Sequence, residues 1–239
     1  MDIDYSPPSP GSVAVILPAA GSGRRFGSHR NKLFATLNNN PLWYIAASRL
    51  RKCSSIGRIV MPVSADDQSV FASEFADQVQ ELGIEIVLGG AQRTDSVQAG
   101  LDTLADDESA RLVAVHDAAR PLVRQADLSA VIANACQSGA AILASPVAGT
   151  IKRKRETGIC TVDRSDLWVA LTPQVFRREL LQRAYQAYRG RPATDDAELV
   201  ERLGYQVALV KGSADNLKIT LPEDLLIAEA ILSQQNEHV

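Results

Sequence analysis

The strongest constraint on the fold is a series of short apolar segments that alternate with amphipathic stretches of helical length. The first segment, VAVIL at 13–17, is a continuous apolar run, which is typical of a strand buried on both faces of a parallel sheet. Further strands are predicted at 58–63, 84–88, 112–116, 140–145 and 205–210. This alternation predicts an α/β fold with helices on both faces of a mostly parallel sheet, a three-layer α/β/α sandwich.

Two helices and one interruption complete this pattern. A helix is predicted to start at Pro41, because apolar residues recur at helical spacing from there to Leu50. The last helix, 223–232, is expected to dock on the edge of the sheet. The segment at about 148–165 has Gly, Thr and a basic run without a helical period, and its Val and Ile residues allow a β-hairpin. We therefore expect a projecting hairpin arm there.

Size and composition limit the number of domains and the classes of partner that we expect. A chain of 239 residues suits a single domain, 1–239, with residues 1–11 as a flexible tail that lacks the regions of a signal peptide. The balance of 25 Lys and Arg against 28 Asp and Glu argues against a nucleic-acid-binding surface. No apolar run is long enough to cross a membrane. Three widely spaced cysteines fit neither a disulfide framework nor a zinc site, and they suit the reducing cytoplasm.

A loop of small residues, PAAGSGRR at 18–25, follows the first predicted strand directly. In an open α/β sheet, ligands bind where such strands end. Free amides from Gly21 onward can surround phosphate oxygens, and Arg25 and Lys32 supply cations nearby. The loop lacks the third glycine of a dinucleotide fingerprint and the lysine of a P-loop. A nucleotide site of another kind is the interpretation we favour, and a tight turn is the alternative.

The sequence HDAAR at 116–120 follows the strand predicted at 112–116 and therefore lies on the same rim of the sheet. The Asp117 carboxylate can hold ribose hydroxyls or approach a Mg²⁺ ion. The alternative is that Asp117 and Arg120 form an ion pair that braces the loop. His116 is interpreted as an ordinary buried histidine whose ring nitrogens are satisfied, since the sequence near it offers no acid–base partner.

Together these segments resemble the 2-C-methyl-D-erythritol 4-phosphate cytidylyltransferase family. The resemblance spans nearly the whole chain and is carried by PAAGSGRR at 18–25, RTDSV at 93–97, HDAARP at 116–121, TVDR at 161–164, LTPQ at 171–174 and DNLKIT at 215–220. It implies a Rossmann-like nucleotidyltransferase sheet, with CTP as co-substrate and Mg²⁺ as metal. It also implies attack of an acceptor phosphate on the α-phosphorus with release of pyrophosphate.

The resemblance assigns roles to particular residues. The catalytic cations on the triphosphate would be Arg25, Lys32 and Lys218. The nucleotide would be bound by Pro18, Ala19, Ala20, Gly21, Gly23, Gly90, Arg93, Ser96 and Asp117. The acceptor would be bound by Asp117, Arg120, Thr150, Arg164, Thr172 and Thr194. Mg²⁺ would be carried mainly by the CTP phosphates, with Asp117 as a possible ligand. Thr150 and Arg164 would reach the site of a neighbouring subunit, which implies a homodimer with arm exchange.

Taken without the resemblance, several of these residues have plainer interpretations. A single Lys or Arg is more often a solvated surface charge. Ser96 reads as a serine on a helix surface, and the TDD sequence at 194–196 reads as a helix N-terminus. Two positions also depart from the family pattern. Asn31 stands where the family usually has proline, which is expected to leave the loop freer. Gly149 replaces an acidic residue in the part of the arm assigned to the acceptor.

Three other functions remain open from the sequence. A ribitol-5-phosphate cytidylyltransferase would share the CTP half of the site, and residues of the arm would distinguish the two acceptors. A catalytically silent nucleotide-binding protein would keep the glycines but could lose charge at Arg25, Lys32 or Lys218, and all three are present. A Rossmann oxidoreductase is disfavoured by the missing third glycine and by the lack of an acidic residue at the end of the second strand.

Overall fold

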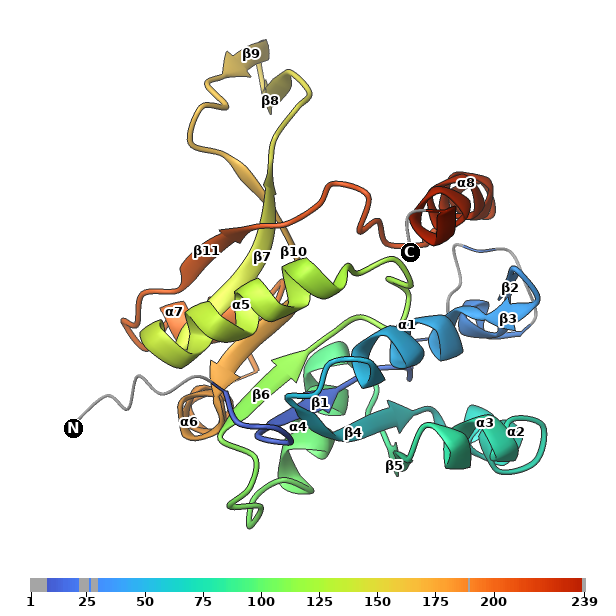
Figure 1. Ribbon diagram of the computed structural model, residues 1–239. Helices are drawn as coiled ribbons and strands as arrows, with labels where there is room; N and C mark the ends of the chain where they lie inside the picture. Colours follow the sequence, from blue (N-terminus) through green and yellow to red (C-terminus); the bar gives the residue numbers. More distant parts are fainter. Residues whose placement is uncertain (1–7, 22–25, 27–29, 189, 238–239) are drawn as a thin grey trace.

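The computed structural model describes residues 8–21, 26, 30–188 and 190–237. Its centre is a seven-stranded sheet with the strand order β11-β7-β10-β6-β1-β4-β5 (Figure 1). Neighbouring strands are parallel except around β10, which runs antiparallel to both β6 and β7. The strands are β1 (Val13–Ile16), β4 (Ile56–Val63), β5 (Ile84–Leu88), β6 (Leu112–Val115), β7 (Ala140–Pro146), β10 (Trp168–Arg177) and β11 (Ala208–Lys211).

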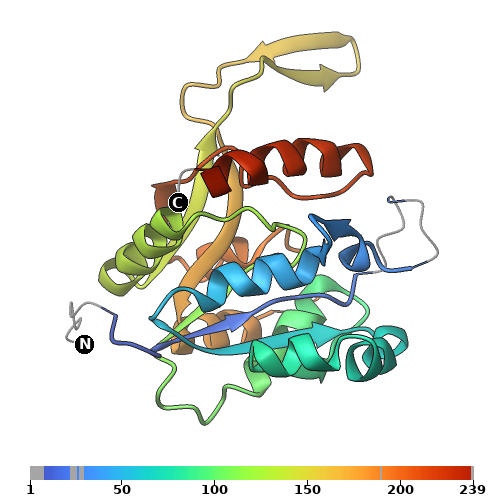
Figure 2. The ribbon, with the colours of Figure 1, turned by 45° about the vertical axis from the view of Figure 1, so that its right-hand side comes forward.

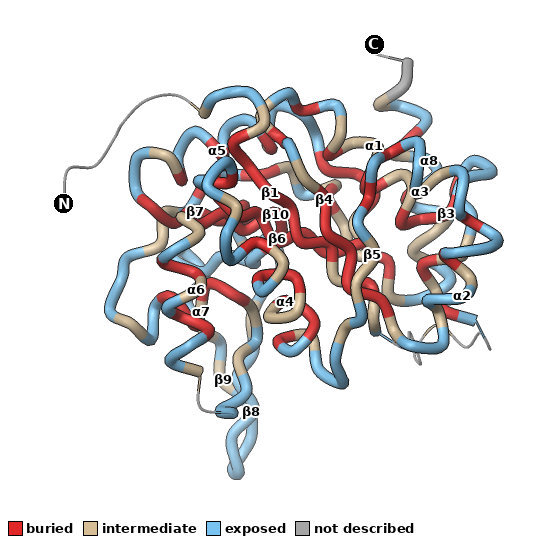
Figure 3. The backbone as a smooth tube through the Cα atoms, turned by 90° about the horizontal axis from the view of Figure 1, so that it is seen from below, coloured by how far each residue is buried: buried red, intermediate tan, exposed pale blue. Residues whose placement is uncertain are grey.

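Helices cover both faces of this sheet (Figure 2). One layer contains α1 (Leu42–Arg51), α2 (Ala65–Ser73), α3 (Ala76–Glu81) and α5 (Gln125–Ser138), and the other contains α4 (Arg93–Asp102), α6 (Arg178–Gln186) and α7 (Asp196–Glu201). Strand β1 shows why the first apolar run has no polar position. Val13 and Val15 pack into the first layer, whereas Ala14 and Ile16 pack into the second. The buried backbone is concentrated along the central strands (Figure 3), and the predicted three-layer sandwich is confirmed.

The six strands predicted from apolar runs are all present, with small differences at their ends. Strand β4 starts two residues earlier than predicted, and β11 covers 208–211 rather than 205–210. Helix α1 begins after Pro41, which occupies the N-cap position.

Strand β10 was not predicted, although it lies between β6 and β7 in the middle of the sheet. Its sequence, WVALTPQVFR, places polar Thr172 and Gln174 on either side of Pro173, which has no N–H to donate. The register between β10 and β7 shifts between Ala170 and Gln174, so the ladder passes over this interruption. The strand forms despite these residues because β6 and β7 pair with it on both sides. The local sequence pattern does not reveal this pairing.

The predicted arm is also present as a hairpin of β8 (Ile151–Arg155) and β9 (Gly158–Val162) that extends away from the sheet (Figure 1). Its strands pair antiparallel, from Ile151 opposite Val162 to Arg155 opposite Gly158. The basic residues at 152–155 are exposed, as expected for a solvated hairpin. Strand β10 starts soon after the hairpin, so the arm is an extension of β7 and β10 beyond the helical layers.

Helix α8 (Glu223–Glu237) does not dock on an edge of the sheet, and that prediction was wrong. Its buried side chains Ala228 and Leu232 pack with Leu37, Leu42 and Leu122. These belong to or adjoin the short ladder of β2 (Thr36–Leu37) and β3 (Asn40–Pro41), so α8 covers that ladder and the loop after β6. Among the helices of the described residues, none has the length and apolar character that a membrane crossing requires.

Candidate active site

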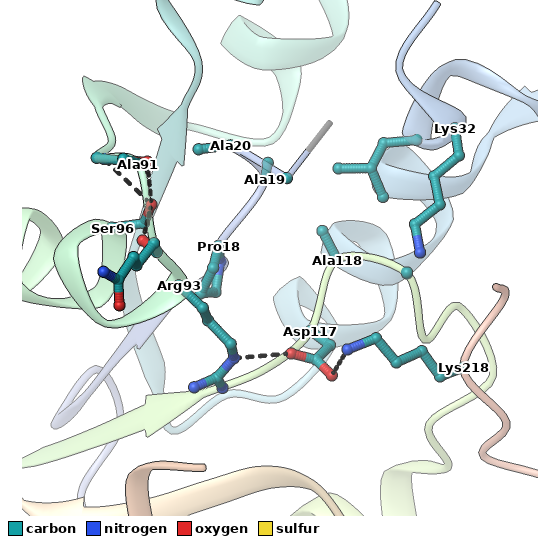
Figure 4. A pocket seen from close by; sticks show the side chains of 15 residues that line it. Pro18, Ala19, Ala20, Lys32, Ala91, Arg93, Ser96, Asp117, Ala118 and Lys218 are labelled. Atoms are coloured by element: carbon teal, nitrogen blue, oxygen red, sulfur yellow. Dashed lines mark hydrogen bonds and ion pairs between the residues drawn. The ribbon is translucent and has the colours of Figure 1, made fainter. Parts of the chain in front are cut away.

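A cavity of about 220 Å³ opens at the carboxyl ends of the central strands (Figure 4). It is lined by the loop after β1, the 3-10 turn η2 (Lys32–Phe34), the start of α4, the loop after β6 and Lys218. The predicted site residues that line it are Pro18, Ala19, Ala20, Gly21, Lys32, Gly90, Arg93, Ser96, Asp117 and Lys218. Gly23 and Arg25, which were also predicted, lie outside the described residues. Five segments distant in sequence thus meet at the place where an open α/β sheet binds ligands.

The loop after β1 continues the sheet for a few residues before it reaches the cavity. The amide of Leu17 donates to Val60 O at 2.9 Å, and that of Ala19 donates to Pro62 O at 2.8 Å. These bonds fix the backbone of Ala19 beside β4. Because its side chains are small, the main chain itself forms this wall of the cavity, as a close approach to a ligand requires.

The opposite wall is shaped by Ser96 and the glycines before α4. Ser96 is only 2% exposed, and its hydroxyl oxygen accepts from the Gly90 amide at 3.2 Å. A Cβ atom on Gly90 would lie 2.3 Å from Asp95 Cβ, so no larger residue fits without a shift. The interpretation of Ser96 as a surface serine is therefore wrong. Its buried hydroxyl instead holds the loop that borders the cavity.

Lys32 and Lys218 both line the cavity although they lie far apart in the sequence. The Lys32 ammonium donates to the carbonyl oxygen of Ile219 at 2.8 Å, next to Lys218. Both lysines extend toward the same side of the cavity (Figure 4). Two ammonium groups at one small cavity supply positive charge that suits an anionic ligand.

The loop at Asn31 is tied down rather than freed, so the expectation based on its departure from proline was wrong. The side-chain amide Nδ2 of Asn31 donates to Ala19 O at 3.2 Å and to Asp67 Oδ2 at 2.8 Å. Its side-chain oxygen accepts from the Leu33 amide at 3.1 Å. Asn31 has a φ of −56°, which is the value that proline would impose. Its side chain therefore supplies by hydrogen bonds the restraint that a ring would supply covalently.

Asp117 is the acidic centre of the cavity and faces three cations. Its carboxylate lies 2.8 Å from Lys218 Nζ, 3.4 Å from Arg93 Nε and 3.6 Å from Arg120 Nε. Burial raises the pKa of Asp117, but the charges of Arg93, Lys218 and Arg120 outweigh burial and hold the pKa well below its usual range. The carboxylate is therefore ionised at any physiological pH, and it can act as a charge but not as a proton donor.

His116 and Thr172 support Asp117 from behind. The Asp117 amide donates to Thr172 Oγ1 at 3.0 Å, and the same hydroxyl lies 3.0 Å from His116 Nδ1. His116 Nε2 lies 3.0 Å from the Arg120 carbonyl, which can only accept, so Nε2 carries the proton and Nδ1 accepts from Thr172. The prediction of a buried, satisfied histidine is confirmed. Thr172 is buried behind the loop and does not line the cavity.

The buried ring of His116 gives a testable pH dependence of stability. Burial lowers its pKa from 6.5 to about 4. The unfolded chain therefore binds more protons between these values, and the contribution of His116 to stability is complete above pH 6.5 and lost as the pH falls to 4. This loss amounts to about 3 kcal/mol. Urea unfolding from pH 4 to 7 should show a steeper decline for the native protein than for His116→Gln. Parallel curves for the two proteins would contradict this account.

Apart from Asp117, the residues assigned to the acceptor do not line this cavity within one chain. Arg120 braces the loop after β6, because it pairs with Asp117 and donates to Asn216 O at 2.8 Å. The Thr194 hydroxyl is exposed and donates to Glu198 at 3.0 Å beside the start of α7. Asp195 rather than Thr194 caps that helix, since its side chain accepts from the Glu198 amide. Thr150 and Arg164 lie exposed on or beside the arm, where Arg164 donates to the Ala148 carbonyl.

One contributor to the site was missed from the sequence. Asp196 is fully buried at the start of α7, and its Oδ2 lies 2.7 Å from Arg93 Nη2. The sequence showed it only as an acidic residue in the first turn of a helix, which is usually a solvated position that favours the helix dipole. The presence of two consecutive aspartates after a threonine was the one available signal, and it pointed to capping.

Comparisons with known proteins identify the family of the chain. The family model for 2-C-methyl-D-erythritol 4-phosphate cytidylyltransferase matches residues 13–234. A protein of that name from Rhodopirellula baltica is 53% identical over 232 residues, covering 93% of this chain and 96% of the relative. Another from Bacillus velezensis is 40% identical over 226 residues, with coverages of 93% and 96%. The crystal structure of the protein of that name from Thermus thermophilus superposes with a TM-score of 0.77 at 33% identity, covering 92% of this chain and 98% of that one. The chain therefore belongs to the 2-C-methyl-D-erythritol 4-phosphate cytidylyltransferase family.

Proposed function

We propose that the protein transfers CMP from CTP to 2-C-methyl-D-erythritol 4-phosphate, forming 4-CDP-2-C-methyl-D-erythritol and releasing pyrophosphate in non-mevalonate isoprenoid precursor synthesis. The observation that carries the proposal is the meeting of Lys32, Lys218 and Asp117 in one cavity at the ends of the parallel strands. Family membership supplies the identity of both substrates, and the geometry supplies a reason why this cavity suits them. The CTP triphosphate would lie toward the lysines, and the cytidine toward Ala19, Ala20, Gly90 and Ser96.

The chemistry requires neutralisation of charge more than proton transfer. An oxygen of the acceptor phosphate attacks the α-phosphorus of CTP, and the bond from that phosphorus to the bridging oxygen of the leaving pyrophosphate breaks. Two anions must approach each other, and negative charge builds on the leaving group. Lys32 and Lys218 are placed to balance that charge. No general base is needed, since a phosphate dianion is already a nucleophile.

The donor set fits a Mg²⁺ ion that arrives with the triphosphate. Among the fifteen residues that line the cavity, Asp117 is the one carboxylate. The described part of the chain also contains no cluster of three or more His, Cys, Asp or Glu that could hold a metal. Mg²⁺ typically binds through substrate phosphates and one or two carboxylates, so Asp117 is the residue that would hold it. When bound, the ion would supply further charge neutralisation on the phosphates.

The proposed assembly is a homodimer in which each arm completes the cavity of the other subunit. Thr150 and Arg164 are exposed and lie on an arm that extends away from the helical layers of its own chain. Large apolar side chains are exposed at the arm and its base, where a partner would cover them: Ile159, Leu167, Trp168 and Val169. Cys53, Cys136 and Cys160 form no disulfide with one another, which is consistent with a cytoplasmic enzyme.

Release of pyrophosphate tests the proposal and separates it from its rivals. The purified protein with Mg²⁺ and CTP is expected to release pyrophosphate only when a polyol phosphate is added, and faster with 2-C-methyl-D-erythritol 4-phosphate than with ribitol 5-phosphate. Faster turnover with ribitol 5-phosphate would instead assign the alternative acceptor. No release with either acceptor, together with tight binding of NAD, would overturn the proposal.

A further inference from the structure

We infer that Asp196 is a positioning residue that orients the Arg93 guanidinium in the nucleotide cavity, and that Tyr185 holds Asp196 in place. The inference rests on the proposed function only for the identity of the ligand, CTP. Arg93 lines the cavity, whereas Asp196 and Tyr185 lie behind it in the layer formed by α6 and α7.

The backbone at Asp196 is fixed by a side chain of the central sheet. The side-chain oxygen Oε1 of Gln174 in β10 accepts from the Asp196 backbone amide at 3.1 Å and from the Ala197 backbone amide at 3.0 Å. The Gln174 amide group also donates to Asp195 Oδ2 at 2.7 Å. Because Gln174 itself is only 1% exposed, the start of α7 is anchored to the sheet at a defined position.

The two oxygens of the Asp196 carboxylate then have different partners. Oδ1 accepts from the Tyr185 hydroxyl at 2.5 Å, and Oδ2 pairs with Arg93 Nη2 at 2.7 Å. The Asp196 side chain is 0% exposed, and Tyr185 is 4% exposed. A buried carboxylate requires a counter-charge, and Arg93 is the cation that provides it. The charge of Asp196 therefore holds the Arg93 guanidinium close to α7.

Arg93 contacts two carboxylates through different nitrogens of its guanidinium. Nη2 lies 2.7 Å from the buried Asp196. Nε lies 3.4 Å from Asp117 in the cavity (Figure 4). Burial lowers the pKa of Arg93, but Asp196 and Asp117 outweigh burial and raise the pKa well above its usual value. The contact to Asp196 is shorter and more buried than the contact to Asp117. We therefore expect Asp196 to orient the guanidinium, while Asp117 remains available to Lys218.

Without the charge of Asp196, Arg93 would keep one carboxylate partner, Asp117. The guanidinium would be drawn toward the cavity and would compete with Lys218 for Asp117. CTP would then meet a misplaced arginine and a displaced lysine. The expected signature is thus a loss of CTP affinity.

Asp196→Asn and Glu201→Gln form a matched pair of variants. Glu201 lies on the same helix and is exposed, and it has no contact with Arg93 or Gln174 among those described. Calorimetric titration of CTP should show that Asp196→Asn raises Kd about tenfold, the lower end of what loss of an orienting partner costs elsewhere. Glu201→Gln should change Kd less than twofold.

A double variant separates positioning from a general loss of structure. In the background of Arg93→Met, Asp196→Asn should change the Kd of CTP less than twofold, because the residue through which it acts is gone. An equal tenfold effect in both backgrounds would overturn the inference. If Asp196→Asn does not fold, Tyr185→Phe removes one hydrogen bond and keeps the charge. This variant should raise Kd about threefold, and an unchanged Kd would overturn the inference.

The failure of this inference is distinguishable from that of the proposed function. If the native protein binds CTP and Asp196→Asn binds it equally well, only the role of Asp196 is overturned. If the native protein does not bind CTP, the proposed function fails, and the NMR signal of the Arg93 Nε–H still tests the inference without ligand. That signal should be sharp in the native protein and broadened by exchange in Asp196→Asn, and equal line widths would contradict the role.

Discussion

Lys218→Ala is expected to lower kcat by roughly 10²–10³-fold, as loss of one preorganised contact to a developing charge does in other enzymes. The Lys218 ammonium lines the cavity and lies 2.8 Å from the Asp117 carboxylate. Charge that builds on the leaving pyrophosphate would lose one of its two nearest lysines. The fold should persist, because Asp117 keeps Arg93 and Arg120 as counter-charges and the Lys218 side chain is 37% exposed. Single-turnover rates and thermal unfolding measure the two effects.

Lys52→Ala is the matched control for this change. Lys52 is an exposed lysine at the end of α1 and does not line the cavity. Its removal should leave kcat within twofold of the native value. A Lys218→Ala protein that is folded and turns over at a near-normal rate would remove Lys218 from the catalytic residues.

A heterodimer of one Lys218→Ala subunit and one Arg164→Ala subunit is expected to recover activity that neither homodimer has. Arg164→Ala alone should lower kcat/KM for the acceptor by roughly 10- to 10²-fold through loss of a charge-assisted contact. With exchanged arms, one of the two sites combines an intact cavity with an intact arm, so the heterodimer should retain about half of the native turnover. Subunits that carry different tags and are purified in tandem supply the mixed dimer for steady-state assays.

The reciprocal heterodimer carries both substitutions in one subunit and none in the other. With exchanged arms, each of its sites contains one defect, and it should be nearly inactive. If each arm serves its own chain instead, the unmodified subunit keeps a complete site and this dimer retains about half of the native activity. The two heterodimers therefore give opposite results under the two arrangements, and the outcome does not depend on the exact loss caused by either substitution.

The strands that could be predicted from the sequence are those in which apolar residues dominate. The run at 13–17 identifies β1 because both of its faces are buried in opposite helical layers. Strand β10 is buried from Leu171 to Phe176 but carries Thr172 and Gln174 there, which hydrogen-bond to the Asp117 amide and to the start of α7. These polar residues support the site, and they interrupt the apolar pattern from which a strand would be predicted. Prediction from local sequence fails where a buried position serves to hold functional residues in place.

The candidate site shows the same division. The glycines and alanines after β1 could be placed at the cavity because residue type and position agree with ligand binding, whereas Gly90, Ser96 and Lys218 were placed there by the resemblance. Asp196 could not, since nothing near it in sequence shows that Arg93 on α4 packs against α7. Asn31 was misjudged for a related reason. Its restraint comes from Asp67 and Ala19, both distant along the chain, and only the tertiary structure brings them to its amide.

The position of β10 links the nucleotide cavity to the arm through a short length of chain. Trp168, at the base of the arm, pairs with Pro146, and Thr172, four positions later, bonds to Asp117. A substitution at an exposed residue between them changes one surface, whereas a deletion or insertion of one residue would turn the side chains beyond it to the opposite face of the sheet. Relatives of this protein should therefore vary freely in composition along 168–170 and in the length of the hairpin tip, while the number of residues from the arm base to Thr172 stays constant.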